Sequence, residues 1–404
     1  MEMTAKKAPG DRLELPLAGA RVVDFSRLLP GPWCTQALGD LGADVIKVEQ
    51  PEVGDYARHN PPNFRSVGAY FNSINRNKRS IVLDLTVAND RNTVYELIDR
   101  ADIIVESFRD GVARKLGVDY DTLAARNPSI IYCSVTGFGN GSKLGRVPGH
   151  DLSIQGVAGI LLKTSQQGQS PPMPTFQGGD FTAAAFATMG VLSAYIRRLK
   201  TKAGCYLEVP MLHSLLAASN VSMSGALARA AGYSGTPEME PWGKNPRYNI
   251  YKTRDGKYVT ACLLEYRAWQ RFCDYIGRSE LAPEESWADR HTDHGERTHA
   301  IKSAIADFCL SRDRDALASE MIAAEIAICP IYSADESVTS EQVRQEEIVE
   351  FTEHPTDGRI PHFVDPLAMA GLADPTRLPS PGLGQHTEEI LNELKAQPRK
   401  ELSK

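Results

Sequence analysis

The order of elements predicted between residues 19 and 50 restricts the possible folds more than any other feature of the sequence. Gly19–Ser26 has the apolar centre typical of a strand, and a helical pattern begins after Leu29-Pro30-Gly31-Pro32. Ala43–Gln50 is a second apolar strand that follows this helix directly. A strand, a helix and a strand in succession favour a parallel pair, so we expect an α/β fold with a parallel sheet.

Further strands and helices are predicted along the rest of the chain. The expected strands after residue 50 are Ser80–Leu85, Asp102–Val105, Ile130–Val135 and Ile326–Ile331, together with a hairpin over Tyr248–Leu264. We expect a helix over Asn89–Arg100 and a closing helix over Thr387–Leu394. Pro361–Leu383 is rich in proline, which predicts an extended returning segment.

Length and composition narrow the class of protein. With 404 residues the chain is longer than one domain usually is, and its 42% hydrophobic and 24% charged residues are typical of soluble globular proteins. The net charge of −6 argues against nucleic acid or an anionic membrane as the main partner. Seven scattered cysteines without CxxC pairs and no apolar signal segment favour a cytoplasmic protein without disulfides or a metal site.

Two polar clusters stand directly before apolar, small-residue runs of helical character. They are Gly149-His150-Asp151 and Gly178-Gly179-Asp180. A helix N-terminus exposes unpaired N–H groups and partial positive charge, which stabilise negative charge beside it. The clusters could simply be helix caps and turns. They could also be catalytic, which makes His150, Asp151, Gly179 and Asp180 candidate catalytic residues.

Several segments resemble a known family when they are taken together and in order. They are Leu17–Asp24, Pro30–Pro32, Leu41–Glu49, Asn75–Ser80, Val105–Phe108, Asn127–Gly139, the two clusters above and Gly384–Leu391. These segments are similar to the class III CoA-transferases, or CaiB/BaiF family. That family includes formyl-CoA transferase, carnitine CoA-transferase and 2-methylacyl-CoA racemase.

The resemblance implies a particular domain organisation. It predicts a large CoA-binding, Rossmann-like domain made from residues 1–225 and 340–404. A linker and a smaller inserted α/β domain would occupy residues 226–339. It also implies an interlocked homodimer, or a heteromer with a related subunit.

The resemblance assigns Asp180 the role of a nucleophile that moves CoA from an acyl-CoA thioester to a free carboxylic acid. The carboxylate would form an acyl anhydride and then an aspartyl-CoA thioester. The bare backbone at Gly178 and Gly179 would offer access and N–H donors to the oxyanion. The CoA thioester would be a substrate, and no permanently bound cofactor is expected.

Two alternatives remain open at this stage. His150 and Asp180 match the acid–base pair of the racemases, and Glu265 matches their active-site glutamate, so an isomerase is possible. A non-catalytic, CoA-binding partner subunit of a heteromer is the other alternative. We favour the transferase.

The resemblance also implies the residues that surround CoA. They are Arg27, Leu28, Leu29, Gln50, Lys78, Ser107, Phe108, Arg109 and Lys115. Lys78 and Lys115 match phosphate-contacting cations, while Gln50 replaces the usual arginine, for which Arg58 or Arg76 could substitute. Trp33, Met239 and Trp242 favour an apolar or aromatic acyl group.

Overall fold

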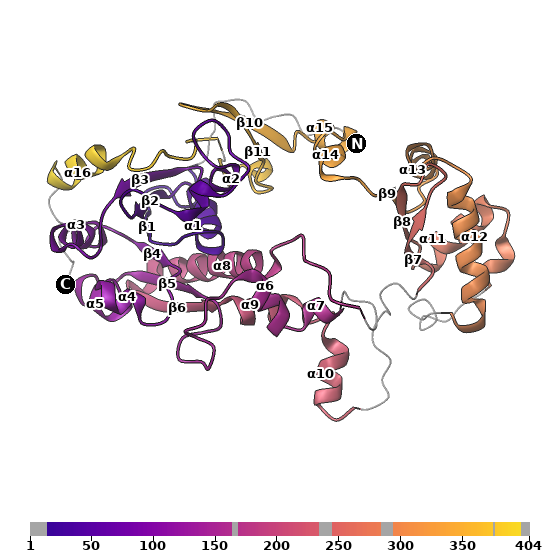
Figure 1. The fold of residues 1–404 in the computed structure, drawn as a ribbon, viewed down its shortest axis with the longest axis horizontal. Helices are drawn as coiled ribbons and strands as arrows, with labels where there is room; N and C mark the ends of the chain where they lie inside the picture. Colours follow the sequence, from indigo (N-terminus) through magenta and orange to yellow (C-terminus); the bar gives the residue numbers. More distant parts are fainter. Residues whose placement is uncertain (1–13, 164–168, 234–244, 284–293, 375, 397–404) are drawn as a thin grey trace. The chain divides into compact units, whose positions relative to one another are not determined.

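The computed structural model describes residues 14–163, 169–233, 245–283, 294–374 and 376–396. The chain divides into two compact units (Figure 1). Unit 1 comprises Met1–Ser219 with Glu347–Lys404, and unit 2 comprises Asn220–Glu346. The boundaries expected from the sequence, at 225 and 340, lie a few residues from these. The chain therefore leaves unit 1 once and returns to it.

A six-stranded parallel sheet forms the centre of unit 1. Its strands are β1 (Arg21–Asp24), β2 (Asp44–Glu49), β3 (Lys78–Val82), β4 (Ile103–Glu106), β5 (Ile131–Thr136) and β6 (Cys205–Pro210). The spatial order is β3-β2-β1-β4-β5-β6, and every neighbouring pair is parallel. The predicted α/β class and parallel sheet are confirmed.

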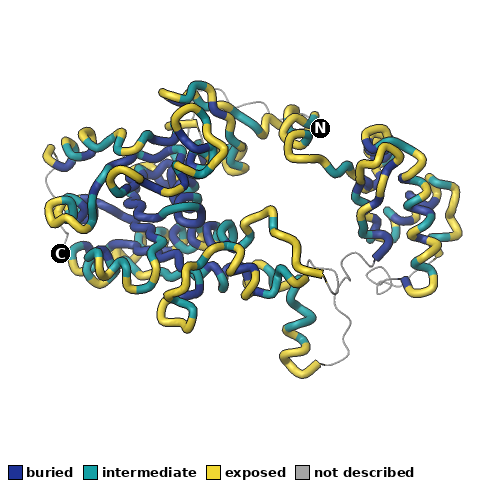
Figure 2. The backbone as a smooth tube through the Cα atoms, in the orientation of Figure 1, coloured by how far each residue is buried: buried dark blue, intermediate teal, exposed yellow. Residues whose placement is uncertain are grey.

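Helices cover both faces of this sheet and bury two separate apolar layers. The helices of unit 1 are α1 (Pro30–Asp40), α2 (Ala69–Ser73), α3 (Ala88–Ile98), α4 (Val112–Leu116), α5 (Tyr120–Arg126), α6 (Asp151–Val157), α7 (Ile160–Lys163), α8 (Gly178–Thr201), α9 (Met211–Ala218) and α16 (Thr387–Ala396). One layer contains residues of α1, α6, α8 and α9, and the other contains residues of α3, α5 and α16. Strands β1 to β5 are mostly buried between them, whereas the edge strand β6 is only partly buried (Figure 2). Near-continuous apolar strands are expected of a parallel sheet covered on both faces.

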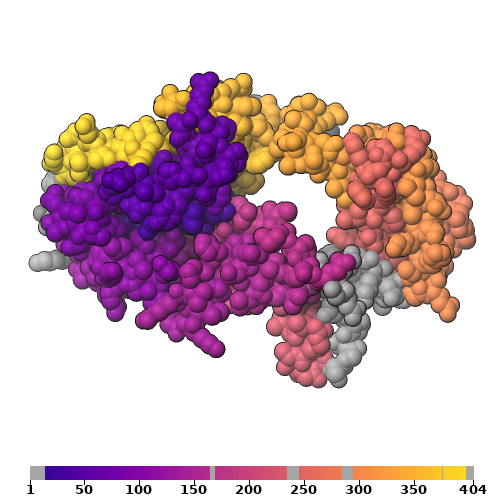
Figure 3. Space-filling model, viewed as in Figure 1, coloured from indigo at the N-terminus to yellow at the C-terminus, as the bar shows by residue number. Residues whose placement is uncertain are grey.

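The last described helix ties the end of the chain to its first third. Arg79 in β3 forms ion pairs with Glu389 and Glu393 of α16, and the His386 ring accepts a hydrogen bond from the N–H of Ser80. In Figure 3 these late residues, in yellow, lie against the purple N-terminal part of unit 1. Residues more than 300 positions apart in the sequence thus share one surface.

A hairpin within the returning segment was not predicted. β10 (Val349–His354) and β11 (Gly358–Phe363) pair antiparallel, and Pro361 lies inside β11. The extended segment predicted from Pro361 onward is therefore confirmed for its first residues, Pro361–Phe363, which end β11. A two-stranded sheet accommodates proline because each strand has an edge that makes no ladder bonds.

Unit 2 is a small α/β body with its own core. An antiparallel sheet of order β7-β8-β9 is built from β7 (Tyr248–Lys252), β8 (Tyr258–Cys262) and β9 (Ile328–Pro330). Its helices are α10 (Ser224–Ala230), α11 (Tyr266–Tyr275), α12 (Thr298–Leu310), α13 (Arg314–Ala323), α14 (Ala334–Val338) and α15 (Glu341–Gln345). Trp269 and Phe272 of α11 pack in the centre of the core. Within the described ranges, no helix has the length and apolarity needed to cross a membrane.

Candidate active site

A cavity of about 140 Å³ opens at the carboxyl ends of β1, β2 and β3, near the end of β4. Its lining comprises Phe25, Ser26, Arg27, Lys47, Val48, Glu49, Gln50, Gly54, Asp55, Leu83, Asp84, Leu85, Thr86, Phe108 and Leu116. The strand order reverses between β1 and β4, and open α/β sheets bind ligands at such a point. The structure thereby brings Arg27, Gln50 and Phe108, three of the residues predicted to bind CoA, to one cavity, named here the switch-point cavity.

Arg27 is held at this cavity by aromatic rings and by its own backbone. Its guanidinium carbon lies 5.3 Å from the ring centroid of Tyr56 and 5.8 Å from that of Phe108. The N–H of Arg27 donates to the hydroxyl of Ser107 at 3.1 Å. A cation stacked over rings keeps its N–H edge free for an anionic ligand, so Arg27 suits a phosphate-bearing substrate.

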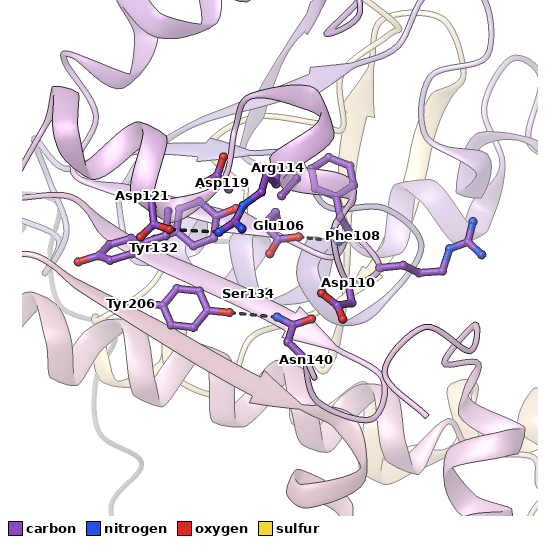
Figure 4. Close-up of a pocket in the computed structure, with 14 residues that line it drawn as sticks. Glu106, Phe108, Asp110, Arg114, Asp119, Asp121, Tyr132, Ser134, Asn140 and Tyr206 are labelled. Atoms are coloured by element: carbon purple, nitrogen blue, oxygen red, sulfur yellow. Dashed lines mark hydrogen bonds and ion pairs between the residues drawn. The ribbon is translucent and has the colours of Figure 1, made fainter. Parts of the chain in front are cut away.

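Phe108 lines both the switch-point cavity and a larger cavity of about 360 Å³, which residues of β4, β5 and β6 also line and which Figure 4 shows. Arg109 lines this second cavity and is not among the residues that line the first. Asn140 donates to the Tyr206 hydroxyl across its mouth at 3.1 Å. The segment from Ser107 to Arg109 therefore runs between two cavities.

Glu106 is the buried carboxyl at the floor of the second cavity. It accepts a hydrogen bond from the N–H of Phe108 at 2.6 Å. Burial raises the pKa of Glu106 to about 7, against the bonds from Ser134 and Phe108, which lower it. This carboxyl is therefore positioned to change its charge near neutral pH while holding the segment that borders both cavities.

Lys78 does not have the position expected of a phosphate contact. Its side chain is fully buried, and its ammonium donates to Asp24 Oδ2, the Pro32 carbonyl and Asn75 Oδ1 at 2.8–3.1 Å. A lysine ammonium has three donors, and all three are used here. The interpretation of Lys78 as a phosphate-binding residue is therefore corrected, because this cation neutralises the buried Asp24 instead.

The two arginines suggested as substitutes for the family arginine at position 50 are also engaged. Arg58 forms an ion pair with Glu49 at 2.6 Å and donates to the Pro381 carbonyl. Arg76 forms an ion pair with Asp40, also at 2.6 Å. Both are oriented toward the interior of unit 1, so neither replaces the missing cation beside Gln50 in this conformation.

The other residues expected around CoA occupy different surroundings. Lys115 is exposed in the last turn of α4, one residue before the cavity-lining Leu116. Leu29 is buried at the start of α1, and the preceding Leu28 has a left-handed backbone with φ of 63°. Lys115 thus stays a candidate for phosphate contact, and Leu29 packs in the interior.

Asp180 lies in the first turn of α8, where it meets the first turn of α6. Asp151 Oδ1 accepts hydrogen bonds from the N–H groups of Gly179 at 2.7 Å and Asp180 at 3.2 Å. Its Oδ2 accepts from the side-chain amide of Gln155 at 2.6 Å. Asp151 therefore caps a helix other than its own, and it fixes the two polar clusters against each other.

Gly179 is needed for the close approach of these two helices. A Cβ atom there would lie 2.9 Å from Ile154 Cγ2 and 3.0 Å from Asp151 Oδ1. The backbone N–H groups of the glycine pair are both used, since Gly178 donates to the Phe176 carbonyl and Gly179 donates to Asp151. The expectation that this pair offers N–H donors to an oxyanion is therefore corrected for this conformation.

The electrostatic surroundings of Asp180 are unusual for a carboxylate. Burial raises the pKa of Asp180 to about 7, and the neighbouring charge of Asp151 adds to the rise. Burial also raises the pKa of Tyr70, helped by the charges of Asp180, Asp55 and Asp151. Perturbed carboxyls cluster at functional sites, which supports Asp180 as a catalytic candidate. Tyr70, in α2, was missed because nothing in the sequence connects residue 70 with residue 180.

Aromatic side chains surround the start of α8. Phe181 meets Trp33 edge to face with centroids 6.1 Å apart, and it stacks on Phe176 at 5.2 Å. The position of Trp33 suits the apolar acyl pocket expected from the sequence. Met239 and Trp242, the other two residues of that expectation, lie outside the described residues.

The two residues implied by the racemase alternative are both exposed. His150 is the residue before α6 and makes no capping hydrogen bond with its side chain. Glu265 belongs to unit 2, where it precedes α11. The described contacts of unit 1 thus join Asp180 to Asp151 and give no specific partner role to His150.

Comparison with known proteins defines the class. Residues 17–387 match the family described as CoA-transferase family III. The chain is 30% identical to a succinyl-CoA:mesaconate CoA-transferase from Haloarcula hispanica, over 92% of this chain and 95% of the relative. It is also 30% identical to a succinate–glutarate CoA-transferase from Agrobacterium fabrum, over 94% of this chain and 96% of the relative.

A solved structure agrees with these matches. A CaiB/BaiF family protein from Brucella suis superposes with a TM-score of 0.79 at 29% sequence identity, over 95% of this chain and all of that one. Fold and sequence together define an enzyme of the CoA-transferase class. The chain belongs to CoA-transferase family III, as the resemblance implied.

Proposed function

We propose that this enzyme transfers CoA from an acyl-CoA thioester to a free carboxylic acid, with Asp180 as the covalent nucleophile. One observation carries the proposal: a partly buried carboxyl stands at the N-terminus of α8, with its pKa raised to about 7. Burial deprives the carboxylate of water, which makes it a better nucleophile once it is ionised.

The reaction divides into four displacements. Asp180 attacks the thioester carbonyl, the carbon–sulfur bond breaks, and CoA leaves as a thiolate with an acyl-aspartyl anhydride behind it. The thiolate then attacks the aspartyl carbonyl and expels the donor acid as a carboxylate, which gives an aspartyl-CoA thioester. The acceptor carboxylate attacks that thioester, releases the thiolate again and forms an anhydride with Asp180. The thiolate finally attacks the acceptor carbonyl of this anhydride, which gives the new acyl-CoA and frees the Asp180 carboxylate.

We propose that the switch-point cavity receives the nucleotide end of CoA, with Arg27 and Lys115 as its cationic contacts. Arg27 lies at the cavity, and Lys115 is exposed one residue before a residue of its lining.

For the acyl group, the surroundings of Asp180 and the relatives favour different acids. Trp33, Phe181 and Phe176 favour an apolar or aromatic acyl chain. The relatives described above are named for succinate, mesaconate and glutarate. We therefore propose an acyl-CoA and a carboxylic acid as the substrate pair, and a panel of both kinds of acid as the means to identify them.

Trapping with hydroxylamine tests the covalent step. Acyl-CoA and hydroxylamine should convert Asp180 to a hydroxamate that mass spectrometry locates on its peptide. Asp180→Asn should give no adduct and should lower transfer by about a thousandfold or more, because an amide cannot form the anhydride.

His150→Ala separates the transferase from the racemase. In a transferase this variant retains measurable transfer and still forms the hydroxamate. In a racemase both variants would stop exchange of the α-proton with deuterated water, because each residue would serve one face of the carbon. Failure to trap Asp180, together with α-proton exchange that needs His150, would refute the proposal. The relatives named above are CoA-transferases, which gives the racemase alternative no support.

We also propose that the enzyme works as a dimer with an interlocked chain path, either with itself or with a related subunit. An apolar stripe on α8, made of Phe186, Met189, Ile196 and Leu199, is between 37% and 57% exposed. Large exposed apolar surfaces usually mark interfaces. Light scattering at micromolar concentration should report twice the chain mass, and a monomer at that concentration would contradict this proposal.

A further inference from the structure

The backbone bend between β1 and α1 contains a residue in an unfavourable conformation. Leu28 has φ of 63°, in the left-handed region that side chains with a Cβ rarely adopt. It follows Ser26 and Arg27, which line the switch-point cavity. A strained conformation persists only where its surroundings hold it, and such residues gather at functional sites.

Two buried charged residues, Asp55 and Lys47, make hydrogen bonds to the backbone of this bend. Asp55 Oδ1 accepts a hydrogen bond from the N–H of Leu28 at 3.0 Å. Lys47 donates to the Ser26 carbonyl at 2.8 Å, and the same ammonium forms an ion pair with Asp55 Oδ2 at 2.9 Å. Asp55 is 1% exposed and Lys47 is fully buried. One ion pair thus holds the backbone on both sides of Arg27.

The segment that begins with Asp55 also positions the side chain of Arg27. Asp55 caps the short 3₁₀ helix Tyr56–His59 by accepting from the N–H of Ala57. Tyr56, the first residue of that helix, provides one of the two rings over which the Arg27 guanidinium lies. The backbone anchor of the bend and the aromatic support of its cation therefore come from adjacent residues.

We propose that Asp55 is a positioning residue that keeps Leu28 left-handed and so preorganises the Ser26–Leu29 bend for the CoA thioester. This inference rests on the proposed function. The two oxygens of Asp55 face the protein backbone and Lys47, so the residue acts through Leu28 and Arg27 rather than on the substrate itself. Preorganisation lowers the cost of ordering a loop when a ligand binds.

Relief of the strain at Leu28 provides the test. Asp55→Ala should weaken binding of free CoA, measured by calorimetry, by about tenfold, the equivalent of the usual cost of a left-handed residue. Adding Leu28→Gly to Asp55→Ala should recover most of that loss, because glycine enters the left-handed region freely. Asp55→Asn, which keeps the Oδ1 acceptor and loses the charge, should lose less affinity than Asp55→Ala.

Glu52→Gly is the matched control in the same background. Glu52 is an exposed residue with φ of 64° that does not line the cavity. Glu52→Gly gives position 52 the same backbone freedom but leaves the Ser26–Leu29 bend unchanged, so it should not restore CoA binding to the Asp55→Ala variant. Equal recovery with Glu52→Gly and Leu28→Gly would mean that Asp55 acts on stability alone, and this would overturn the inference.

A variant that leaves Asp55 intact covers the case in which Asp55→Ala does not fold. Leu28→Val should bind CoA more weakly than Leu28→Gly by a similar factor of about ten, because β-branched residues are especially poor in the left-handed region. Equal affinities of these two variants would overturn the inference. A wild-type enzyme that does not bind CoA at all would instead remove the proposed function and the inference with it, whereas binding that is insensitive to Asp55 removes the inference alone.

Discussion

The proximity of Asp151 to Asp180 predicts how activity depends on pH. If Asp180 is the nucleophile it must be ionised, so kcat/KM, which reports the free enzyme, should rise as the pH increases through about 7. Burial is the larger cause of the raised pKa of Asp180, which goes from 3.8 to about 7, and Asp151 is the smaller one. The charge of Asp151 therefore accounts for less than half of the rise.

Asp151→Asn removes that charge while its side-chain oxygen can still accept from the N–H groups of Gly179 and Asp180. The acidic limb of the pH profile should move to lower pH by at most about 1.5, which corresponds to about 2 kcal/mol of repulsion removed. At pH 5.5 the variant should then be more active relative to its own maximum than the wild type. The assay is CoA transfer between pH 5 and 9, followed by chromatography of the acyl-CoA products.

Asp121→Asn is a suitable control, because Asp121 is exposed on α5 and is not among the groups that raise the pKa of Asp180. It should leave the limb in place. An acidic limb that stays at its wild-type pH in Asp151→Asn, or that moves upward, would refute the assignment of this limb to Asp180.

Three further predictions concern stability. Burial raises the pKa of Glu106 from 4.5 to about 7, so the folded chain favours the protonated form and loses stability as the pH rises from about 4.5 to 7. Glu106→Gln should therefore raise Tm at pH 8, where the gain in free energy of unfolding is at most about 3 kcal/mol, and should leave Tm unchanged at pH 4. An equal gain at both pH values would contradict this prediction. Gly179→Ala should destabilise unit 1 by about 1–3 kcal/mol in urea titrations, because its Cβ meets Ile154 at 2.9 Å, and unchanged stability would mean that the helices separate freely. Trp269→Ala should cost about 3–5 kcal/mol, since its side chain is fully buried in the core of unit 2, and a loss below 1 kcal/mol in the same titration would show that the core collapses around it.

Local patterns predicted the elements that contain their own signals. The strands beginning near Arg21 and Asp44 were predicted from apolar runs, and the start of α8 was predicted from the Gly-Gly-Asp cluster. The family resemblance, confirmed by the match over residues 17–387, identified the enzyme class before any contact was known. Both successes depend on information within a few consecutive residues or on their order.

The predictions that were wrong or incomplete concern partners distant in sequence. Lys78 carries a positive charge, but only the fold reveals that Asp24 stands 3.1 Å away and uses it. Asp151 was predicted as a candidate catalytic residue of the Gly149-His150-Asp151 cluster, and only the fold reveals that it caps α8, which begins at Gly178. Tyr70 had no sequence signal, because only the fold brings it close enough to Asp180 for that charge to add to the effect of burial on its pKa. Such pairings depend on tertiary structure, which a single sequence does not display.

The attachment of α16 to β3 has a consequence for synthesis on the ribosome. The six strands of the sheet are complete once Pro210 has been synthesised. The ion pairs of Arg79 with Glu389 and Glu393, and the hydrogen bond from the N–H of Ser80 to His386, can form only after α16 has been synthesised. Unit 2 is translated in the interval. Until then the guanidinium of Arg79 has its ion pair with Asp44 of β2 but not those with α16. The edge strand of the nascent sheet therefore stays uncovered by its own helix, and cellular chaperones would meet that edge first.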